Sequence, residues 1–569
     1  MKMRSNYPHF FCINKLFIYE IINKIMGNRI RYIKSHKNQT EYEEFLNSDN
    51  FIIPNISLID SNGKIIINND KLSYYSKKYF TIENIGDYEL TLYVTSNSCM
   101  ASQNLELYYC FRNSDDWQEL GEDIIRIPTS ESVKFKCIIT KGEAIGQFVI
   151  EGNSTCKVYG NAMSLVFGDD FIDKTDLSEY DNVFYNLLQN CALLVDASNL
   201  ILQATKLASW CYGYMFNGCT SLICAPELPA TTLEEGCYYS MFRGCTSLTS
   251  ALELLATTLT NGCYQDMFQG CTNLVNAPSV LPAKTLKDSC YYGMFYGCTS
   301  LTTAPELPAT TLASYCYEGM FGGCTRLTTA PKLPATYLES NCYSNMFQGC
   351  TSLTTAPELP TTYFLASYCY SSMFGDCTSL TSAPELPATT LKDSCYYGMF
   401  YGCTSLTTAP ELPATTLASS CYASMFQGCT SLTTAPKLLA TTLESSCYQG
   451  MFNGCTSLTS APELLATTLT SRCYQGMFYG CTSLTSAPEL PAKTLRDYCY
   501  YNMFYGCSNL NSITMLAIYI KSASNCLYYW VNGVASSGTF IKSSELSEET
   551  IGSGVSGIPN GWTVEDYNK

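Results

Sequence analysis

The sequence CYEGMFGGCTRLTTAPKLPATYL, residues 316–338, is one copy of a motif that recurs along more than half of the chain. Its Met-Phe pair marks twelve copies, at Met215, Met241, Met267, Met294, Met320, Met346, Met373, Met399, Met425, Met451, Met477 and Met503. The step is 26 residues, and it is 27 only from Met267 to Met294 and from Met346 to Met373. A fixed period of this length is typical of a solenoid, in which each unit buries its apolar face against its neighbours.

The spacing within one copy predicts how the unit folds. Apolar residues at i, i+4, i+8 and i+9, namely Leu312, Cys316, Met320 and Phe321, predict one or two helical turns with a single buried stripe. Gly323 follows, and its site is Gly in every copy except for Asp376, which predicts a left-handed residue that ends the turn. Inward residues then come at every third position and predict a short strand and an arc: Cys324, Leu327, Ala330 and Leu333.

Prolines follow this arc in most copies, as at Pro305 and Pro308. Because proline cannot donate to a β ladder, the paired part of each rung should be the two or three residues before the first proline. Three leucines replace the second proline and predict an apolar contact with a neighbour there: Leu255, Leu439 and Leu465. Both 27-residue steps take their extra residue near this point, at 279–281 and 362–364, which predicts a loop.

The segment FGGCTRLTTAPKLP, which begins at Phe321, follows the pattern F-xx-C-xx-L-xx-A/I-xx-L-P. It resembles the BspA-like leucine-rich repeats of bacterial surface proteins, in a slightly longer unit. The resemblance implies a curved right-handed solenoid with stacked parallel strands, and a role in adhesion or ligand binding. The motif residues are core residues, so no catalytic or ligand-contact position is carried over with it.

Length and charge limit the classes of function. A chain of 569 residues predicts several domains. Its formal net charge of −16 argues against nucleic-acid binding, because phosphate binding needs a basic face. It contains no run of eighteen apolar residues, so we expect no membrane span.

Cysteine is unusually abundant, with 32 residues, most of them in pairs such as Cys316 and Cys324. The sequence has no CxxC motif, and its histidines are His9 and His36, so we expect no metal site and no cofactor. Rungs about 4.8 Å apart would permit a disulfide framework as an alternative. The favoured interpretation is buried free thiols in core columns.

The N-terminal residues 1–71 predict an attachment segment with a short helix at 40–46. This segment is similar to N-terminal segments of phage and prophage structural proteins from gut bacteria. Polar residues interrupt residues 1–25 and no small-x-small cleavage site follows, so a signal peptide is not convincing. Met26 is an alternative start, and residues 1–25 would then be untranslated or disordered.

The remaining flanks predict further domains. Runs at 90–94, 105–111, 133–139 and 147–150 predict strands of a small β-sandwich over 72–162. Trp117 lies in a turn-rich link there, as a packing residue or, less commonly, a ligand platform. Residues 163–202 predict a cap and a degenerate repeat, with Leu187, Leu188 and Cys191 in the places of Met215, Phe216 and Cys219. After the solenoid at 203–510, residues 511–569 predict a C-terminal β cap and tail in which Trp562 folds back on the last rung. This tail resembles the ends of repeat proteins in gut bacteria and their prophages.

Catalytic constellations are hard to find. The array has no histidine, no glycine-rich phosphate loop and no acid/base pair set apart from its equivalents, so we predict that the protein is not an enzyme. An acidic column is interrupted by Ser279, Lys332 and Lys437 and predicts a solvated outer face, with a calcium ladder as the alternative. Its members are Glu227, Glu253, Glu306, Glu358, Glu385, Glu411, Glu463 and Glu489.

Two sites vary between copies while the inward residues repeat almost unchanged. The position after Phe supplies the candidate ligand-binding residues Arg243, Gln269, Tyr296, Gln348, Tyr401, Gln427, Tyr479 and Tyr505. The pair between Cys-Tyr and Met adds Tyr239, Tyr292 and Tyr397. Tyr, Gln and Arg are common in binding surfaces, although ordinary drift at solvent-facing sites would also vary them.

Together these patterns predict a mainly β protein with short helical turns, a leucine-rich-repeat solenoid of about twelve to thirteen repeats and a preceding small β-sandwich. The predicted function is non-enzymatic recognition or adhesion at the cell surface or outside the cell, with a host-cell or bacterial-surface protein or glycan as partner. The alternative is a virion-associated phage protein, structural or receptor-binding and of the fibre type.

Overall fold

The computed structural model describes residues 58–59, 65–66, 74–95, 106–360 and 365–567. The chain divides into two units, Met1–Asn69 and Asp70–Lys569. In the first unit, β1 (Leu58–Ile59) pairs antiparallel with β2 (Ile65–Ile66). The helix predicted at 40–46, residues 1–25 and the insertion at 362–364 lie outside the described residues.

The second unit begins with two sheets built from alternating apolar and β-branched residues. Their strands are β3 (Phe80–Asn84), β4 (Leu90–Thr95), β5 (Leu107–Phe111), β6 (Gln118–Glu119), β7 (Ile125–Ile127), β8 (Ser132–Cys137), β9 (Gln147–Gly152), β10 (Cys156–Asn161) and β11 (Leu194–Ile201). One sheet has the order β11-β10-β3-β8-β5-β6 and the other β7-β4-β9. All pairs are antiparallel except β10 with β11. The strands predicted at 90–94, 133–139 and 147–150 are confirmed, and the strand predicted at 105–111 is described from Leu107.

Phenylalanine rings join the two sheets. Phe148 of β9 lies 5.5 Å from Phe80 of β3 and 5.0 Å from Phe135 of β8, measured between ring centroids. All three side chains are fully buried. Trp117 packs edge-on against Tyr79 at 4.9 Å, as expected for a packing residue. The inner faces of the two sheets therefore share one core.

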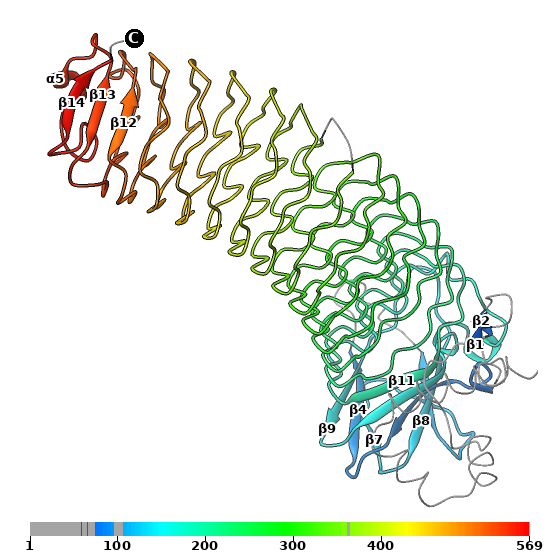
Figure 1. Ribbon diagram of the computed structural model, residues 1–569. Helices are drawn as coiled ribbons and strands as arrows, with labels where there is room; N and C mark the ends of the chain where they lie inside the picture. The colour runs from blue at the N-terminus through cyan, green and yellow to red at the C-terminus, as the bar shows by residue number, and fades with distance from the viewer. Residues whose placement is uncertain (1–57, 60–64, 67–73, 96–105, 361–364, 568–569) are drawn as a thin grey trace, which may run out of the picture. The chain divides into compact units, whose positions relative to one another are not determined.

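The sheets lead directly into the repeats. After α4 (Ser164–Phe167) and η1 (Gly168–Asp170), the chain enters β11, whose Asp196 bridges in parallel to Cys224 of the following repeat. Leu188 donates from its backbone N to Met215 O, as Phe216 does to Met241 in the next repeat. The backbone at Leu188 therefore bonds to the next repeat in the same way as the backbone at Phe216. Figure 1 shows successive repeats as similar coils lying side by side.

The segment around each Met-Phe pair is a series of hydrogen-bonded turns, so the predicted helical turns are wrong. We call residues 315–324, and their equivalents in other repeats, the turn segment. Its amides alternate between two kinds of partner. Met320 N donates to Tyr317 O within the repeat at 3.2 Å, whereas the next amide, Phe321 N, donates to Met346 O of the following repeat at 2.9 Å. Along this segment, one amide closes a turn within the repeat and the next amide bonds to the following repeat, in alternation.

Left-handed residues explain why no helix forms there. Tyr315, Gly319 and Gly323 have φ angles of 61°, 61° and 71°. A helix needs consecutive right-handed residues, so a left-handed residue at every fourth position ends each turn. The left-handed conformation predicted for the Gly323 site is confirmed, and Asp376 adopts it with φ of 57°.

Two ladders of stacked rings fill the interior of the array. Phenylalanines from Phe216 to Phe504 stack with centroids 5.4–5.8 Å apart. Tyrosines from Tyr212 to Tyr500 stack at 5.5–6.2 Å. These tyrosines were expected to be partly buried, but at most 2% of each is exposed. Each ring therefore packs mainly on its own equivalents.

The cysteine columns are buried, as predicted. The second cysteine of each turn segment donates its thiol to a backbone carbonyl of the preceding repeat, which is Leu188 O for Cys219 and a phenylalanine O in later repeats. Cys324 Sγ, for example, donates to Phe295 O at 3.2 Å. This bond needs a hydrogen on sulfur, so the thiol is part of the hydrogen-bonded frame. Burial raises the pKa of Cys324 to about 12.

The remainder of the repeat, residues 325–338 in the same copy, we call the proline segment. Its pairing is sparse, because only single residues such as Thr329 and Thr355 form parallel bridges. Thr329 stands two residues before the first proline, where the short paired part was predicted. The leucines that replace the second proline are only partly covered: Leu255 is 48% exposed, and Leu439 and Leu465 are each 43% exposed.

A small parallel sheet covers the C-terminal end of the array. It consists of β12 (Ser512–Met515), β13 (Thr539–Lys542) and β14 (Thr563–Asp566), with α5 (Glu548–Ile551) between the last two strands. Trp562 is buried and donates from Nε1 to Ala535 O at 2.7 Å. The expectation that Trp562 folds back is therefore confirmed. Over the described residues the chain is mainly β with few helices, as predicted.

Candidate functional site: the turn face

The turn segments present a row of variable side chains to solvent. In one copy Cys316, Tyr317, Met320 and Phe321 are buried. The residues between and beside them, at 315, 318, 319 and 322, carry the sequence variation. We call these four positions, taken over all repeats, the turn face. Alternating backbone bonds fix its geometry, so its side chains can change without breaking the frame.

Every predicted binding residue lies on the turn face. The exposed ones include Tyr296, Tyr397 and Tyr401, at 45%, 43% and 41%, together with Arg243. The half-buried ones are Tyr239, Gln269, Tyr292, Gln348, Gln427, Tyr479 and Tyr505. They are spread along the array and do not form one cluster. The structure brings together only subsets of them.

One subset is an aromatic group near the C-terminal end. Tyr479 and Tyr505 stack with centroids 4.7 Å apart and an interplanar angle of 1°. Nearby, Arg472 lies over the Tyr498 ring at 5.1 Å. Tyr479 and Tyr505 therefore use one ring face on each other, and each offers less free ring area than Tyr296.

A second aromatic group lies near the N-terminal end. Tyr239 contacts Trp210 at 5.0 Å and Tyr214 at 5.2 Å, and Tyr214 in turn contacts Tyr185 at 5.4 Å. Burial raises the pKa of Tyr239, which is also hydrogen-bonded to Tyr214. These aromatic rings therefore pack against one another.

A third, mixed group lies between them and centres on Asp266. Only 6% of Asp266 is exposed, and burial raises its pKa to about 6, while the Arg243 guanidinium acts in the opposite direction. Its Oδ1 has no hydrogen-bond partner among the described residues. A Cβ atom at Gly293 would lie 2.2 Å from this oxygen, so the glycine leaves room for the carboxyl group.

Tyr296 completes this group. A Cβ atom at Gly322 would come within 2.7 Å of two Tyr296 ring atoms, which shows that the ring lies against glycine backbone. The ring is nevertheless 45% exposed. Beside it, burial raises the pKa of Glu318, whose Oε2 has no hydrogen-bond partner among the described residues. An open ring face and unpaired carboxyl oxygens therefore lie on neighbouring repeats.

Sequence reasoning missed part of the turn face. Asp266 and Glu318 fell within the variable pair but were not singled out. The position before the first cysteine was missed as well, although it carries bulky residues where other copies have Gly, Ser or Asn. These residues have positive φ angles: Trp210, Tyr315, Tyr368, Arg472 and Tyr498. A bulky side chain in this conformation costs conformational energy, so its identity was a usable signal.

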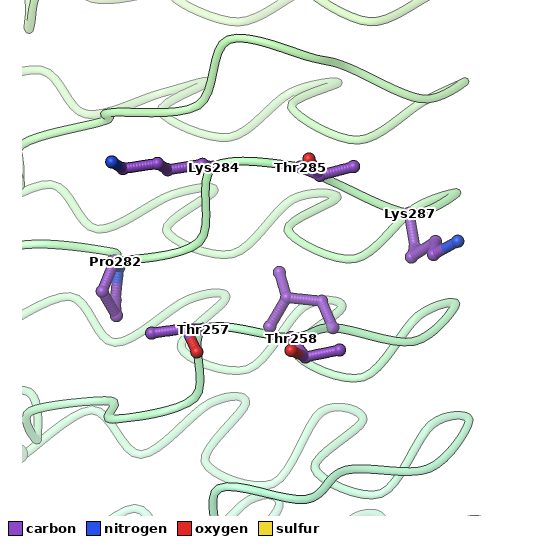
Figure 2. Close-up of a pocket in the computed structure, with 7 residues that line it drawn as sticks. Thr257, Thr258, Pro282, Lys284, Thr285 and Lys287 are labelled. Carbon is purple, nitrogen blue, oxygen red and sulfur yellow. The ribbon is translucent and has the colours of Figure 1, made fainter.

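Two other features of the described residues do not bring several functional side chains together. The described residues contain no group of three or more His, Cys, Asp or Glu side chains arranged to hold a metal ion. A shallow groove of about 380 Å³ lies at the 27-residue step, between Thr257 and Lys284. Figure 2 shows Lys284 and Lys287 pointing to opposite ends of this groove.

The acidic column is exposed along the array, as the prediction of a solvated face requires. Ser279 interrupts it and donates from its backbone N and its Oγ to the Glu253 carboxylate, both at 3.0 Å. Within the described part of the chain, no helix is both long enough and apolar enough to cross a membrane.

Comparison with known proteins agrees with the repeat pattern. The family described as BspA type leucine rich repeat region matches residues 266–399, 340–471, 368–511 and 437–532. A leucine-rich repeat protein from Bacteroides ovatus, solved by crystallography, is similar over 76% of this chain and 97% of its own, with 16% identity and a TM-score of 0.43. Among curated protein sequences, none matches this chain. The repeats over residues 266–532 are therefore similar to BspA-type leucine-rich repeats.

Proposed function

We propose that this protein is a non-enzymatic recognition or adhesion protein that binds a partner protein or a glycan along its turn face. One observation carries the proposal: variable polar and aromatic side chains stand on a backbone frame whose inward residues barely change. In such an arrangement binding specificity can vary while the fold is preserved. The BspA-type repeats support an interaction role for the array.

The composition of the turn face supports binding. Exposed tyrosines such as Tyr296 and Tyr401 combine flat apolar area with a hydroxyl group, and glutamines such as Gln348 add adaptable hydrogen bonding. In this proposal the repeats form a curved right-handed solenoid of about twelve to thirteen units. The small β-sandwich at 72–162 precedes it, and the protein acts at the cell surface or outside the cell.

A triple substitution tests the proposal. Tyr296→Ala, Tyr401→Ala and Tyr479→Ala together remove flat contact area from three well-separated repeats. We expect binding of the purified full chain to epithelial cells and to bacterial cells, measured by flow cytometry, to weaken by about tenfold or more. The thermal unfolding temperature should stay the same, because the frame is untouched. Unchanged binding would remove the turn face from the proposal.

Immunogold labelling tests the location. Label on the bacterial envelope supports the cell-surface proposal. Label confined to purified virions would replace it with the virion-associated alternative that the sequence of residues 1–71 raises.

A further inference from the structure

We propose that the mixed group around Asp266 is a binding site for a neutral oligosaccharide. The inference rests on the proposed function and names the ligand class of one site on the turn face. The site draws on four consecutive repeats, and we call it the Asp266 site. Its residues are Arg243, Asp266, Gln269, Tyr292, Tyr296 and Glu318.

Unpaired buried oxygens are the first argument. Asp266 Oδ1, Gln269 Oε1 and Glu318 Oε2 are buried atoms without a hydrogen-bond partner among the described residues. Buried acceptors without donors destabilise a fold, so they are rare unless a ligand or water supplies the donor. Here three of them lie within three consecutive repeats of one surface, with Asp266 and Gln269 on one repeat and Glu318 two repeats further on. A ligand rich in hydroxyl groups would supply the missing donors.

The open aromatic face is the second argument. Tyr296 packs one side of its ring against the backbone of Gly322, while almost half of the side chain stays exposed. A flat ring that is supported from behind and open in front suits the apolar face of a pyranose. Tyr292, on the same repeat, is half-buried, and its pKa is raised first by burial and then by the Glu318 and Asp266 carboxyl groups. The Tyr292 ring and the carboxyl groups of Glu318 and Asp266 therefore lie close to one another.

The charged side chains of the Asp266 site favour a neutral ligand. Arg243 acts electrostatically on Asp266, so a second cation bound there would be repelled by the guanidinium group. An anion would be repelled by the Asp266 and Glu318 carboxyl groups. The site instead offers donors from Arg243 and acceptors from the carboxyl and amide groups, which matches a hydroxyl group that both donates and accepts.

Asp266 also stands out from its equivalents. Its column has no other acidic residue: Tyr214, Ser240, Gly293, Gly319, Asn345, Ser372, Gly398, Ser424, Gly450, Gly476 and Asn502. The frame therefore does not need a carboxyl group at this position. Three rung-to-rung steps of about 4.8 Å separate Arg243 from Glu318, which gives a site long enough for a short oligosaccharide.

Calorimetric titration of the full chain tests the ligand class. The neutral probes are maltoheptaose, cellohexaose and mannohexaose, and the charged probes are a polygalacturonate hexamer and oligolysine. We expect a neutral oligosaccharide to bind and Tyr296→Ala to weaken it by about tenfold or more. Tyr337→Ala is the control, because Tyr337 is 56% exposed and lies in the proline segment outside the turn face, and it should change the affinity less than about twofold.

Asp266→Gly separates a binding role from a structural one. Glycine tolerates the left-handed backbone at this site, where φ is 54°, and it already occupies the equivalent Gly293 and Gly319 sites. We expect the affinity for the neutral oligosaccharide to fall about tenfold or more while the unfolding temperature stays equal or rises, because an unpaired buried oxygen is removed. A structural residue would instead lower the unfolding temperature.

Three results would overturn the inference: binding of a charged probe but no neutral one, equal losses for Tyr296→Ala and Tyr337→Ala, or unchanged affinity in Asp266→Gly. Cell binding with no bound neutral oligosaccharide would overturn this inference and leave the proposed function standing. Absence of both would remove the proposed function as well.

Discussion

The two segments of each repeat satisfy the same backbone in different ways. In the turn segment alternate amides close a turn or reach the next repeat, as Tyr317 N does to Cys342 O at 3.1 Å. In the proline segment, bridges between repeats are confined to single residues such as Thr329. The turn segment is therefore the rigid half of the repeat, and the proline segment is a loosely paired connection.

This difference explains where variation and cysteine occur. The turn segment can carry Tyr, Gln, Arg or Gly outward because the backbone, and not these side chains, holds neighbouring repeats together. It also holds both cysteine columns, which lie beside the buried rings. The proline segment accepts an extra residue at 279–281 while Leu281 remains buried. The rigid half is the better platform for recognition, and the following predictions test that contrast.

The largest expected effect is loss of stability in alkaline solution. Burial raises the pKa of Cys324, Cys342 and Cys377 to about 12, and that of Cys473 to about 11. An unfolded thiol ionises near pH 8.5 and a folded one does not, so stability is complete below that pH and falls as pH rises toward 12. The loss should be about 1.4 kcal/mol per pH unit for each such thiol. Urea unfolding in reducing buffer from pH 7 to 11 measures it.

The control for this prediction removes thiols. Replacing Cys324, Cys350 and Cys377 by Ala should reduce the number of protons released on unfolding at pH 10 by about three. A wild-type free energy of unfolding that does not change between pH 8.5 and 10 would contradict the burial of the thiols.

The next effect concerns the ring ladder. Phe347→Ala should lower the free energy of unfolding by about 3–5 kcal/mol, because it leaves a cavity between Phe321 and Phe374. Gln348→Ala, one residue further on the turn face, should change it by less than about 0.5 kcal/mol. Chemical denaturation measures both. Similar losses for the two variants would show that the turn face and the interior are not distinct.

A smaller effect tests the left-handed positions. Gly349 has φ of 72°, so Gly349→Ala should destabilise by about 1–2 kcal/mol although its Cβ atom has room 3.6 Å from Gly323. Asp376→Gly, at the equivalent position of the next repeat, should have the opposite sign. If both substitutions destabilise equally, the left-handed backbone conformation does not explain why glycine is preferred at this position.

The smallest effect lies in the proline segment. Leu439→Pro and Leu465→Pro restore the residue that most other copies carry, and each should stabilise by about 0.4–1 kcal/mol by restricting the unfolded chain. The reverse change, Pro334→Leu, should destabilise by a similar amount. Thermal unfolding measures all three. A large loss in either leucine variant would show that these exposed leucines make contacts that their 43% exposure does not indicate.

The period of the repeats predicted much of the fold. The types of single residues predicted the remaining features only in part. The buried columns, the left-handed Gly323 site and the position of Trp562 all followed from residue type and spacing. The helical turn was wrong because an apolar spacing of four fits both a helix and a series of four-residue turns, and only the left-handed Tyr315 and Gly319 distinguish them. The candidate tyrosines lie on the turn face, and their role in binding stays a prediction. The partnerless oxygens of Asp266 and Glu318 could not be predicted, because they depend on which groups adjacent repeats bring together.

Native-state hydrogen exchange, followed by mass spectrometry on peptides from each half of the repeat, tests the central contrast most directly. The structure predicts slow exchange for turn-segment amides such as Tyr317, Gly319 and Phe321, and faster exchange for proline-segment amides such as Lys332, Leu333 and Ala335. Equal exchange rates in the two halves, or faster exchange in the turn segments, would contradict a rigid frame beneath the variable surface.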